Sequence, residues 1–229
     1  MDIQTIIDLD HQLLPFFNGS DSLFLDRWMV VLTSGITWIP LYLSLLYLVV
    51  KNNETMAQIL LIVGCAFLCV ILSDGMADLI AKPLVARPRP GNDPLLKYTI
   101  RVVNDLRGTD FSFFSAHAAN TFSLAVFFCC LVRDRLLGVV LVSWSLLNCY
   151  TRLYLGLHYP SDITVGLLWG AVSGIIAYFT FRKIYHKISP RLNYISSQYT
   201  VTGYQCSDVD IVAVVFLLTL VYTIFRTII

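Results

Sequence analysis

Residues 57–80 read AQILLIVGCAFLCVILSDGMADLI, and no charged side chain occurs between Ala57 and Ser73. A run of about 20 mostly apolar residues is long enough for a helix to cross the hydrocarbon core of a bilayer. The stretch therefore predicts a transmembrane helix.

The rest of the chain repeats this pattern. Of the 229 residues, 57% are hydrophobic and 14% are charged, whereas about a quarter of the residues in a soluble domain are charged. Six runs are long and apolar enough to span a membrane: about 28–50, 57–80, 113–132, 136–157, 161–181 and 209–228. The sequence predicts an all-α polytopic membrane protein with six transmembrane helices, folded as a single membrane-embedded domain over residues 1–229.

The amino terminus has a different composition. Residues 3–17 mix apolar and acidic positions at loosely helical spacing, which suits a short helix lying in the membrane interface. The first 26 residues contain five aspartates and no Lys or Arg, so they lack the basic region of a secretory signal. We therefore expect the first apolar segment to remain in the mature protein.

Six spans place both termini, loop 83–112 and turn 157–161 on one side of the membrane. The opposite side carries seven basic residues and loop 82–112 carries six, so the positive-inside rule alone does not orient the chain. If the cations of the loop serve a ligand, the remaining charge balance and the acidic amino terminus favour both termini outside.

Some partners and cofactors are not expected. The formal net charge is +1 and no basic block suggests nucleic acid. Five of the six cysteines lie inside predicted spans, and no CxxC or Cys/His ligand spacing occurs. We expect no disulfide, no metal and no cofactor.

The stretch RLYLGLHYPSD, residues 152–162, brings three ionisable groups to the end of an apolar run. His158 and Asp162 are one turn apart if a helix begins near Pro160. Asp162 could then accept a hydrogen bond from one ring nitrogen and leave the other as a nucleophile. Alternatively, Asp162 only suits the positive end of the helix dipole, and His158 is an ordinary interfacial residue. Arg152 would supply a cation nearby, or it could be a snorkelling side chain at a helix end.

Ser115 and His117 open the span 113–132. A helix start offers free N–H groups and a positive dipole end to an anionic oxygen. Ser115 could add a hydroxyl donor or be an ordinary N-cap, and His117 could protonate a leaving group.

The segment KPLVARPRP, residues 82–90, contains Lys82, Arg87 and Arg89. Its cations and prolines form a stiff basic turn that suits phosphate oxygens, although a charged flank can also mark a membrane boundary. Asp78 could orient Lys82 by an i to i+4 pair, or form a common helix salt bridge with it. Cations, a helix start and two histidines on one membrane face point to phosphoryl transfer without a metal.

These residues resemble the type 2 phosphatidic acid phosphatase superfamily of membrane lipid phosphatases, whose motifs are KxxxxxxRP, PSGH and SRxxxxxHxxxD. The corresponding stretches here are KPLVARPRP (82–90), FSAH (114–117) and TRLYLGLHYPSD (151–162). Phe114 replaces Pro, Ala116 replaces Gly and Thr151 replaces Ser, while all the ionisable positions match.

The resemblance implies an in-line double displacement. His158, polarised by Asp162, would attack phosphorus, and His117 would protonate the departing oxygen and then activate water. The equatorial oxygens would be held by Lys82, Arg89, Ser115, the N–H of Ala116, and Arg152. It also implies a lipid phosphate or diphosphate substrate, such as undecaprenyl diphosphate, phosphatidylglycerophosphate, phosphatidic acid or lipid A phosphate. We expect a bacterial inner membrane location with the site facing the periplasm.

Two other functions use the same residues. A phosphotransferase would pass the phosphoryl group to another molecule instead of water. A transporter or lipid-binding protein would use the polar cluster only to hold a headgroup, although binding alone needs no nucleophile with an opposed acid. Vanadate-dependent haloperoxidases share a similar pocket but are soluble. The sequence specifies no oligomeric state.

Overall fold

The computed structural model describes residues 2–188 and 197–228, and this part of the chain forms helices without a β-strand. The α-helices are α1 (Ile3–Phe17), α2 (Leu23–Thr33), α3 (Ile39–Lys51), α4 (Met56–Asp74), α5 (Lys82–Val85), α6 (Ala116–Val132), α7 (Arg135–Tyr154), α8 (Pro160–Ile188) and α9 (Cys206–Ile228). A π-helical segment, Gly75–Ala81, joins α4 to α5. The predicted all-helical fold is confirmed.

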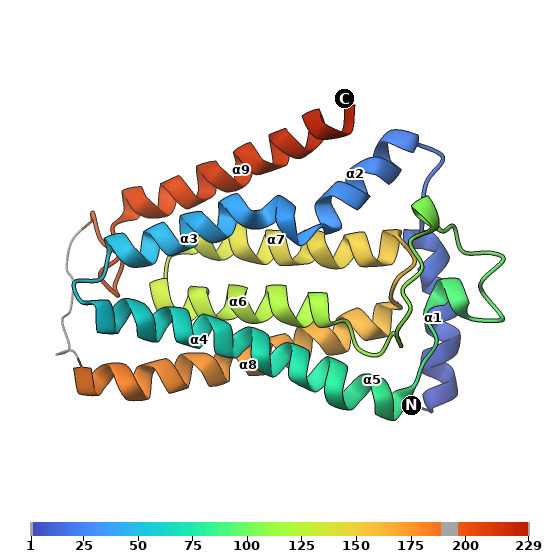
Figure 1. The fold of residues 1–229 in the computed structure, drawn as a ribbon, viewed down its shortest axis with the longest axis horizontal. Coiled ribbons are helices and arrows are strands. Elements are labelled where there is room, and N and C mark those ends of the chain that lie inside the picture. The colour runs from blue at the N-terminus through green and yellow to red at the C-terminus, as the bar shows by residue number, and fades with distance from the viewer. Residues whose placement is uncertain (1, 189–196, 229) are drawn as a thin grey trace.

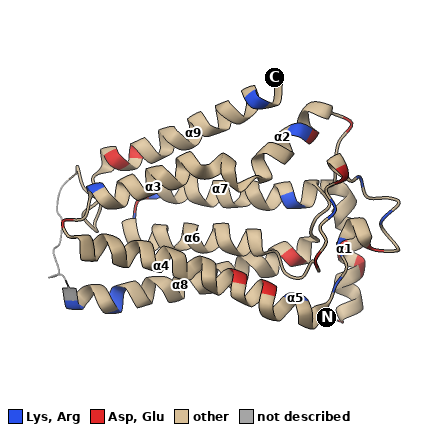
Figure 2. Cartoon of the chain, viewed as in Figure 1, with Lys and Arg blue, Asp and Glu red and all other residues tan. Residues whose placement is uncertain are grey.

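The longer helices run along one axis, and α1 lies across one end of the bundle (Figure 1). The long loop that follows α5 lies at the same end, and both termini point toward it. Most charged residues lie near the ends of the bundle, while the middles of the helices are largely uncharged (Figure 2). This distribution fits a bundle whose central part is surrounded by hydrocarbon.

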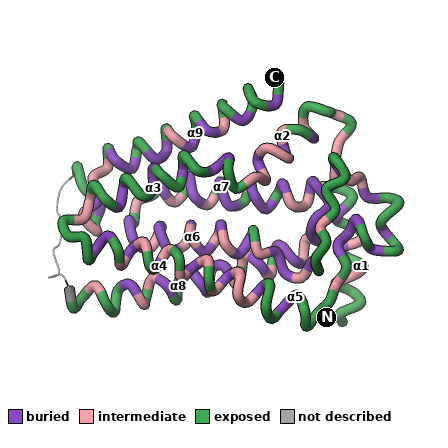
Figure 3. The backbone as a smooth tube through the Cα atoms, in the orientation of Figure 1, coloured by how far each residue is buried: buried purple, intermediate pink, exposed green. Residues whose placement is uncertain are grey.

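The chain is a multi-pass membrane protein. Within residues 2–188 and 197–228, four segments are long and apolar enough to cross a bilayer: Met56–Asn92, Arg135–Tyr154, Pro160–Lys187 and Cys206–Ile228. A bent pair, α2 with the segment Gly35–Lys51, raises the number to five. Many apolar side chains on the outside of the bundle are exposed, for example Leu60 (65%) and Leu168 (64%), and exposed positions recur along the outer helices (Figure 3). Lipid tails would cover these side chains.

The first predicted span, 28–50, is not one straight helix. The chain bends by 68° between α2 and the segment Gly35–Lys51. The Thr37 hydroxyl donates to the carbonyl of Val31 at 2.6 Å, and the Trp38 indole N–H donates to the carbonyl of Leu32 at 2.9 Å. Because these side chains satisfy carbonyls freed by the break, the bend keeps its polar groups paired.

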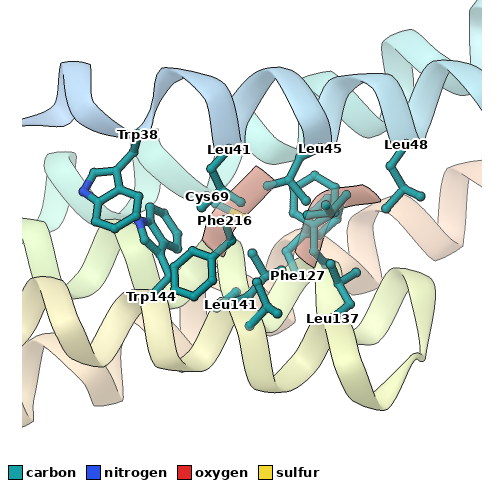
Figure 4. Packing of buried hydrophobic residues seen from close by; sticks show 14 of the residues in the cluster. Trp38, Leu41, Leu45, Leu48, Cys69, Phe127, Leu137, Leu141, Trp144 and Phe216 are labelled. Atoms are coloured by element: carbon teal, nitrogen blue, oxygen red, sulfur yellow. The ribbon is translucent and has the colours of Figure 1, made fainter. Parts of the chain in front are cut away.

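Large side chains from several helices form the core between α3, α7 and α9. Trp38 packs edge-on against Trp144 and is stacked on Phe216, and Leu41 and Leu45 of α3 extend this contact along the bundle (Figure 4). The core holds α7 in place against α3 and α9. Helix α7 carries Arg152 near its carboxyl end.

Helices α6 and α8 pack closely because α8 carries glycine at three successive i+4 positions. A Cβ at Gly166, Gly170 or Gly174 would lie 2.6–2.8 Å from the carbonyl oxygens of Ser115, Ala119 and Ser123 in turn. Small residues at this spacing let helix backbones approach in a membrane. The packing holds the amino-terminal ends of α6 and α8 side by side.

We expect Gly170→Ala to destabilise the protein. The added Cβ would lie 2.7 Å from the Ala119 carbonyl oxygen, and overpacking of this kind costs about 1–3 kcal/mol. Thermal unfolding in detergent should show a lower Tm. Gly64→Ala is the matched control, because a Cβ at Gly64 in α4 meets nothing within 4 Å. An equal Tm for the two variants would contradict the packing argument.

Candidate active site

The structure brings the sequence-predicted site residues together at the end of the bundle covered by α1. They come from the start of α5 (Lys82), the following loop (Arg89), the start of α6 (Ser115, Ala116, His117), the end of α7 (Arg152), and the turn into α8 with its first residues (His158, Asp162). Lys82, Arg89, Arg152 and His158 all lie close enough to His117 to act electrostatically on its imidazole. The three motifs therefore meet at one place.

His158 is held by a backbone carbonyl. Its side chain is almost entirely buried, and its Nδ1 lies 2.9 Å from the carbonyl oxygen of Ser112. A carbonyl only accepts, so Nδ1 carries the proton and Nε2 keeps its lone pair. Within residues 2–188 and 197–228, no side chain or backbone group hydrogen-bonds to Nε2. The tautomer is the one that a nucleophile requires.

The predicted hydrogen bond between Asp162 and His158 does not form. Asp162 Oδ2 lies 3.6 Å from His158 Nδ1, beyond hydrogen-bond distance. Oδ2 instead accepts the backbone N–H of Tyr159 at 3.0 Å. The expectation that Asp162 accepts the ring proton is therefore wrong, because the Ser112 carbonyl accepts it; Asp162 acts on His158 as a nearby negative charge.

The first turn of α8 is also joined to the start of α6. The α8 helix begins at Pro160, as predicted, and the backbone carbonyl of Asp162 accepts the N–H of Ser115 at 3.2 Å. The two segments that carry His158 and His117 are thus tied by a direct backbone bond in addition to the glycine packing.

Burial lowers the pKa of His158 to about 4, with a further lowering by the positive charges of Arg152 and Arg89; Asp162 opposes the shift. An ordinary histidine has a pKa of about 6.5. His158 is therefore neutral near pH 7, the form in which its Nε2 can attack an electrophile.

We expect the His158 imidazole to remain unprotonated when the pH falls from about 8 to about 5. Histidine-selective NMR of the protein in detergent measures this, since a protonated ring shifts its carbon resonances. The chain has four histidines, so the spectrum of the His158→Ala variant assigns the signal. A signal that titrates with a midpoint near 6.5, the ordinary value, would contradict the prediction.

Ser115 lies at the N-cap of α6. An N-cap was one of the two roles that the sequence predicted for it, beside that of a hydroxyl donor. Its Oγ accepts the N–H of Ala118 at 3.4 Å, and the side chain is fully buried. A capping hydroxyl still has its own proton to donate, so the capping role leaves it able to bind an oxyanion. His117 follows two residues later and is exposed, which suits a group that must reach a leaving oxygen.

The three cations differ in how they are held. Lys82 Nζ lies 2.6 Å from Asp78 Oδ1, which confirms the predicted i to i+4 pair. Arg89 is buried and donates to the carbonyls of Asp110 (3.0 Å) and Leu157 (3.2 Å), so it also positions the residue before His158.

One N–H donor of Arg152 has no hydrogen-bond partner among the described residues. Its Nη1 donates to Thr33 Oγ1 at 2.9 Å. Its Nε is buried and has no partner among the described residues. A buried unpaired guanidinium N–H is costly, and an oxyanion of the substrate would satisfy it. The contact with Thr33 also places the bend between α2 and α3 beside the site.

Two residues that support the site, Ser112 and Asp10, were not singled out by the sequence, and a third, Arg87, was expected only as part of the basic turn. Ser112 supplies the carbonyl for His158, Arg87 donates to Asp162 Oδ1 at 3.3 Å, and Asp10 of α1 pairs with Arg87 at 2.8 Å. Local spacing carries no signal for Ser112 or Asp10, because they are 46 and 77 positions from their partners. The GxxxGxxxG spacing at 166–174 was the available signal for the α6–α8 contact.

Known proteins resemble this chain over most of its length. A lipid A 4'-phosphatase of Bacteroides thetaiotaomicron is 42% identical over 83% of this chain and 83% of its own length. A lipid A 4'-phosphatase of Porphyromonas gingivalis is 28% identical over 77% of this chain and 74% of its own length. The crystal structure of Aquifex aeolicus LpxE has the same fold, with a TM-score of 0.58 and 24% identity, covering 74% of this chain and 94% of that one.

Within the described residues, no group of three His, Cys, Asp or Glu side chains could hold a metal ion. The family comparison is specific: residues 33–185 match the PAP2 superfamily, and this range contains all three motifs. The chain therefore belongs to the PAP2 superfamily and is a lipid phosphatase, a hydrolase of phosphoric esters.

Proposed function

We propose that the protein hydrolyses a phosphate monoester of lipid A, at the 4'-position. The observation that carries this proposal is the 42% identity, over 83% of both chains, to a protein named lipid A 4'-phosphatase. The site supports it, since two histidines and three cations converge beside membrane-spanning helices and suit the phosphate of a substrate whose chains stay in the bilayer.

The proposed reaction has two steps. His158 Nε2 attacks phosphorus and forms a phosphohistidine, while the bond from phosphorus to the sugar oxygen breaks and His117 protonates that oxygen. Neutral His117 then takes a proton from a water molecule, whose oxygen attacks the phosphohistidine; inorganic phosphate leaves and His158 is restored.

The remaining predicted site residues stabilise charge. Lys82, Arg89, Arg152, the Ser115 hydroxyl and the Ala116 N–H hold the equatorial oxygens of the transferred group, where negative charge is spread in the transition state. Asp162 stabilises the positive imidazole ring of the phosphohistidine. The buried Nε of Arg152, which finds no partner in the described part of the chain, supports this assignment, because an oxyanion would give it one.

An apolar cavity of about 520 Å³ provides a place for an acyl chain. It lies between α3, α4 and α6 and is lined almost entirely by aliphatic and aromatic side chains. Asn120 and Thr121 of α6 line it as well, and they follow His117 by one helical turn. A lipid with its phosphate at His117 could therefore extend a chain into this cavity without leaving the membrane.

The membrane arrangement completes the proposal. The chain forms one membrane-embedded domain that crosses six times: α6 adds a crossing to the five counted above. Its 17 residues extend roughly 26 Å, a little less than the bilayer core of about 30 Å. Helix α1 lies in the interface, and the site faces the periplasm of a bacterial inner membrane.

The test is a phosphate-release assay without added magnesium on purified protein in detergent. Lipid A bisphosphate is compared with undecaprenyl diphosphate, phosphatidylglycerophosphate and phosphatidic acid. We expect lipid A to have the highest kcat/KM, and fragment mass spectrometry to place the lost phosphate at the 4'-position. Radiolabelled phosphate on a second lipid instead of in solution would indicate a phosphotransferase. A preference for another lipid would contradict the proposed substrate.

A further inference from the structure

Helix α1 has two dissimilar faces. Ile3, Ile6, Leu9, Leu13 and Phe16 are exposed along one face, while Asp10 and Leu14 are buried on the other. Leu14 packs in a small cluster with Leu96, Ile100 and Tyr159. A carboxylate is seldom buried without a partner, so the partners of Asp10 indicate what this helix does.

Asp10 binds the beginning of α8 through two hydrogen bonds. Its Oδ1 accepts the backbone N–H of Ser161 at 2.9 Å, and its Oδ2 accepts the Ser161 hydroxyl at 2.5 Å. A carboxylate at this place satisfies a free N–H and faces the positive end of the helix dipole. Ser161 directly precedes Asp162, so α1 holds the turn on which the nucleophile depends.

Arg87 joins the same carboxylate to Asp162. Its Nη2 donates to Asp10 Oδ2 at 2.8 Å, and its Nη1 lies 3.3 Å from Asp162 Oδ1. The guanidinium carbon is 3.6 Å from the centre of the Tyr159 ring. A planar fork that reaches two carboxylates while stacked on an aromatic ring is an arrangement that arginine makes and lysine does not.

The chain of contacts ends at His158. Asp162 has no exposed surface, and a carboxylate is seldom buried without a charged or hydrogen-bonding partner. Arg87 is such a partner: its Nη1 contacts Oδ1, while the other oxygen, Oδ2, lies 3.6 Å from His158 Nδ1. With Arg87 in place, Asp162 presents a fixed negative charge to the ring that becomes positive as the phosphohistidine forms.

We propose that Asp10 and Arg87 are positioning residues of the active site, and that α1 is thereby part of the catalytic apparatus. Asp10 holds Arg87, Arg87 holds the Asp162 carboxylate in place, and Asp162 stabilises His158 in the transition state. The inference rests on the proposed role of His158 as the nucleophile.

The test measures kcat and KM of full-length variants in detergent on the lipid phosphate that the wild type hydrolyses best. We expect Arg87→Gln to lower kcat by about 10–100-fold, the loss typical when a partner that orients a metal ligand is removed, with KM nearly unchanged. Arg87→Lys should recover part of this loss, and Asp10→Asn should lower kcat less than Arg87→Gln. Asp8→Asn is the matched control, because Asp8 is exposed on the same helix and meets only Gln4 among the described residues.

A double-mutant comparison separates positioning from general structural support. In an Asp162→Asn background, Arg87→Gln should cost little further activity, because the group that it positions is gone. An equal loss in both backgrounds, or a wild-type kcat for Arg87→Gln, would overturn the inference. If Arg87→Gln does not fold, the losses of activity caused by Asp10→Asn and Arg87→Lys are compared in the same two backgrounds. An active His158→Ala protein would instead refute the proposed mechanism itself.

Discussion

The His158→Ala variant is expected to release phosphate about 10⁴–10⁶-fold more slowly than the wild type, the range seen when a catalytic nucleophile or its base is removed. The structure gives the reason: Nδ1 is tied to the Ser112 carbonyl at 2.9 Å, so Nε2 is the nitrogen left to attack phosphorus. Substrate binding should change little, because the cations that hold the phosphate are untouched. Phosphate release under single-turnover conditions measures the loss directly.

A covalent intermediate distinguishes this mechanism from simple water attack. Wild-type protein quenched in alkali during turnover of a ³²P-labelled lipid should carry acid-labile radiolabel on His158, and the variant should carry none. His186→Ala is the matched control, since His186 lies in the last turn of α8, far along the chain from the site. Turnover by the His158→Ala protein at the wild-type rate would refute the phosphohistidine mechanism.

Local sequence rules predicted the helix starts around the site. A proline near a helix start, a serine at an N-cap and an Asp–Lys pair at i, i+4 each involve residues within one turn. The structure accordingly has α8 beginning at Pro160, Ser115 capping α6, and Lys82 paired with Asp78. The all-helical architecture followed from the long apolar runs.

Local sequence rules do not predict contacts that depend on the path of a loop. The Nδ1 partner of His158 belongs to the long loop between α5 and α6, and nothing in the spacing of the third motif indicates that Ser112 returns to that position. The bend of the first span was missed for a related reason: its carbonyls are satisfied by Thr37 and Trp38, residues that read as ordinary members of a membrane span. Asp10 has the sequence pattern of an acidic residue of an interfacial helix, because its partners Arg87 and Ser161 lie 77 and 151 positions away.

The π-helical segment Gly75–Ala81 is another feature that local sequence rules do not predict. An extra residue in a helical turn rotates everything that follows around the helix axis, and such turns are frequent near functional sites. Here the segment leads directly into Lys82. A regular helical wheel from α4 would therefore place Lys82 on the wrong face, although its pairing with Asp78 remains predictable.

The His117→Ala variant should lose activity in a way that depends on the leaving group. Hydrolysis of the lipid phosphate should slow by about 10²–10⁴-fold, the usual contribution of general acid catalysis, because a sugar alkoxide needs a proton to depart. The phosphoryl-transfer step with 4-nitrophenyl phosphate should slow far less, because nitrophenolate leaves without one. The burst of nitrophenolate in rapid-mixing experiments measures that step apart from the later attack of water. His117 lies at the exposed start of α6, within electrostatic reach of Lys82, Arg89 and Arg152, a position from which it can meet the leaving oxygen. Equal losses on both substrates would show that His117 holds the phosphate group and does not transfer a proton to the leaving group.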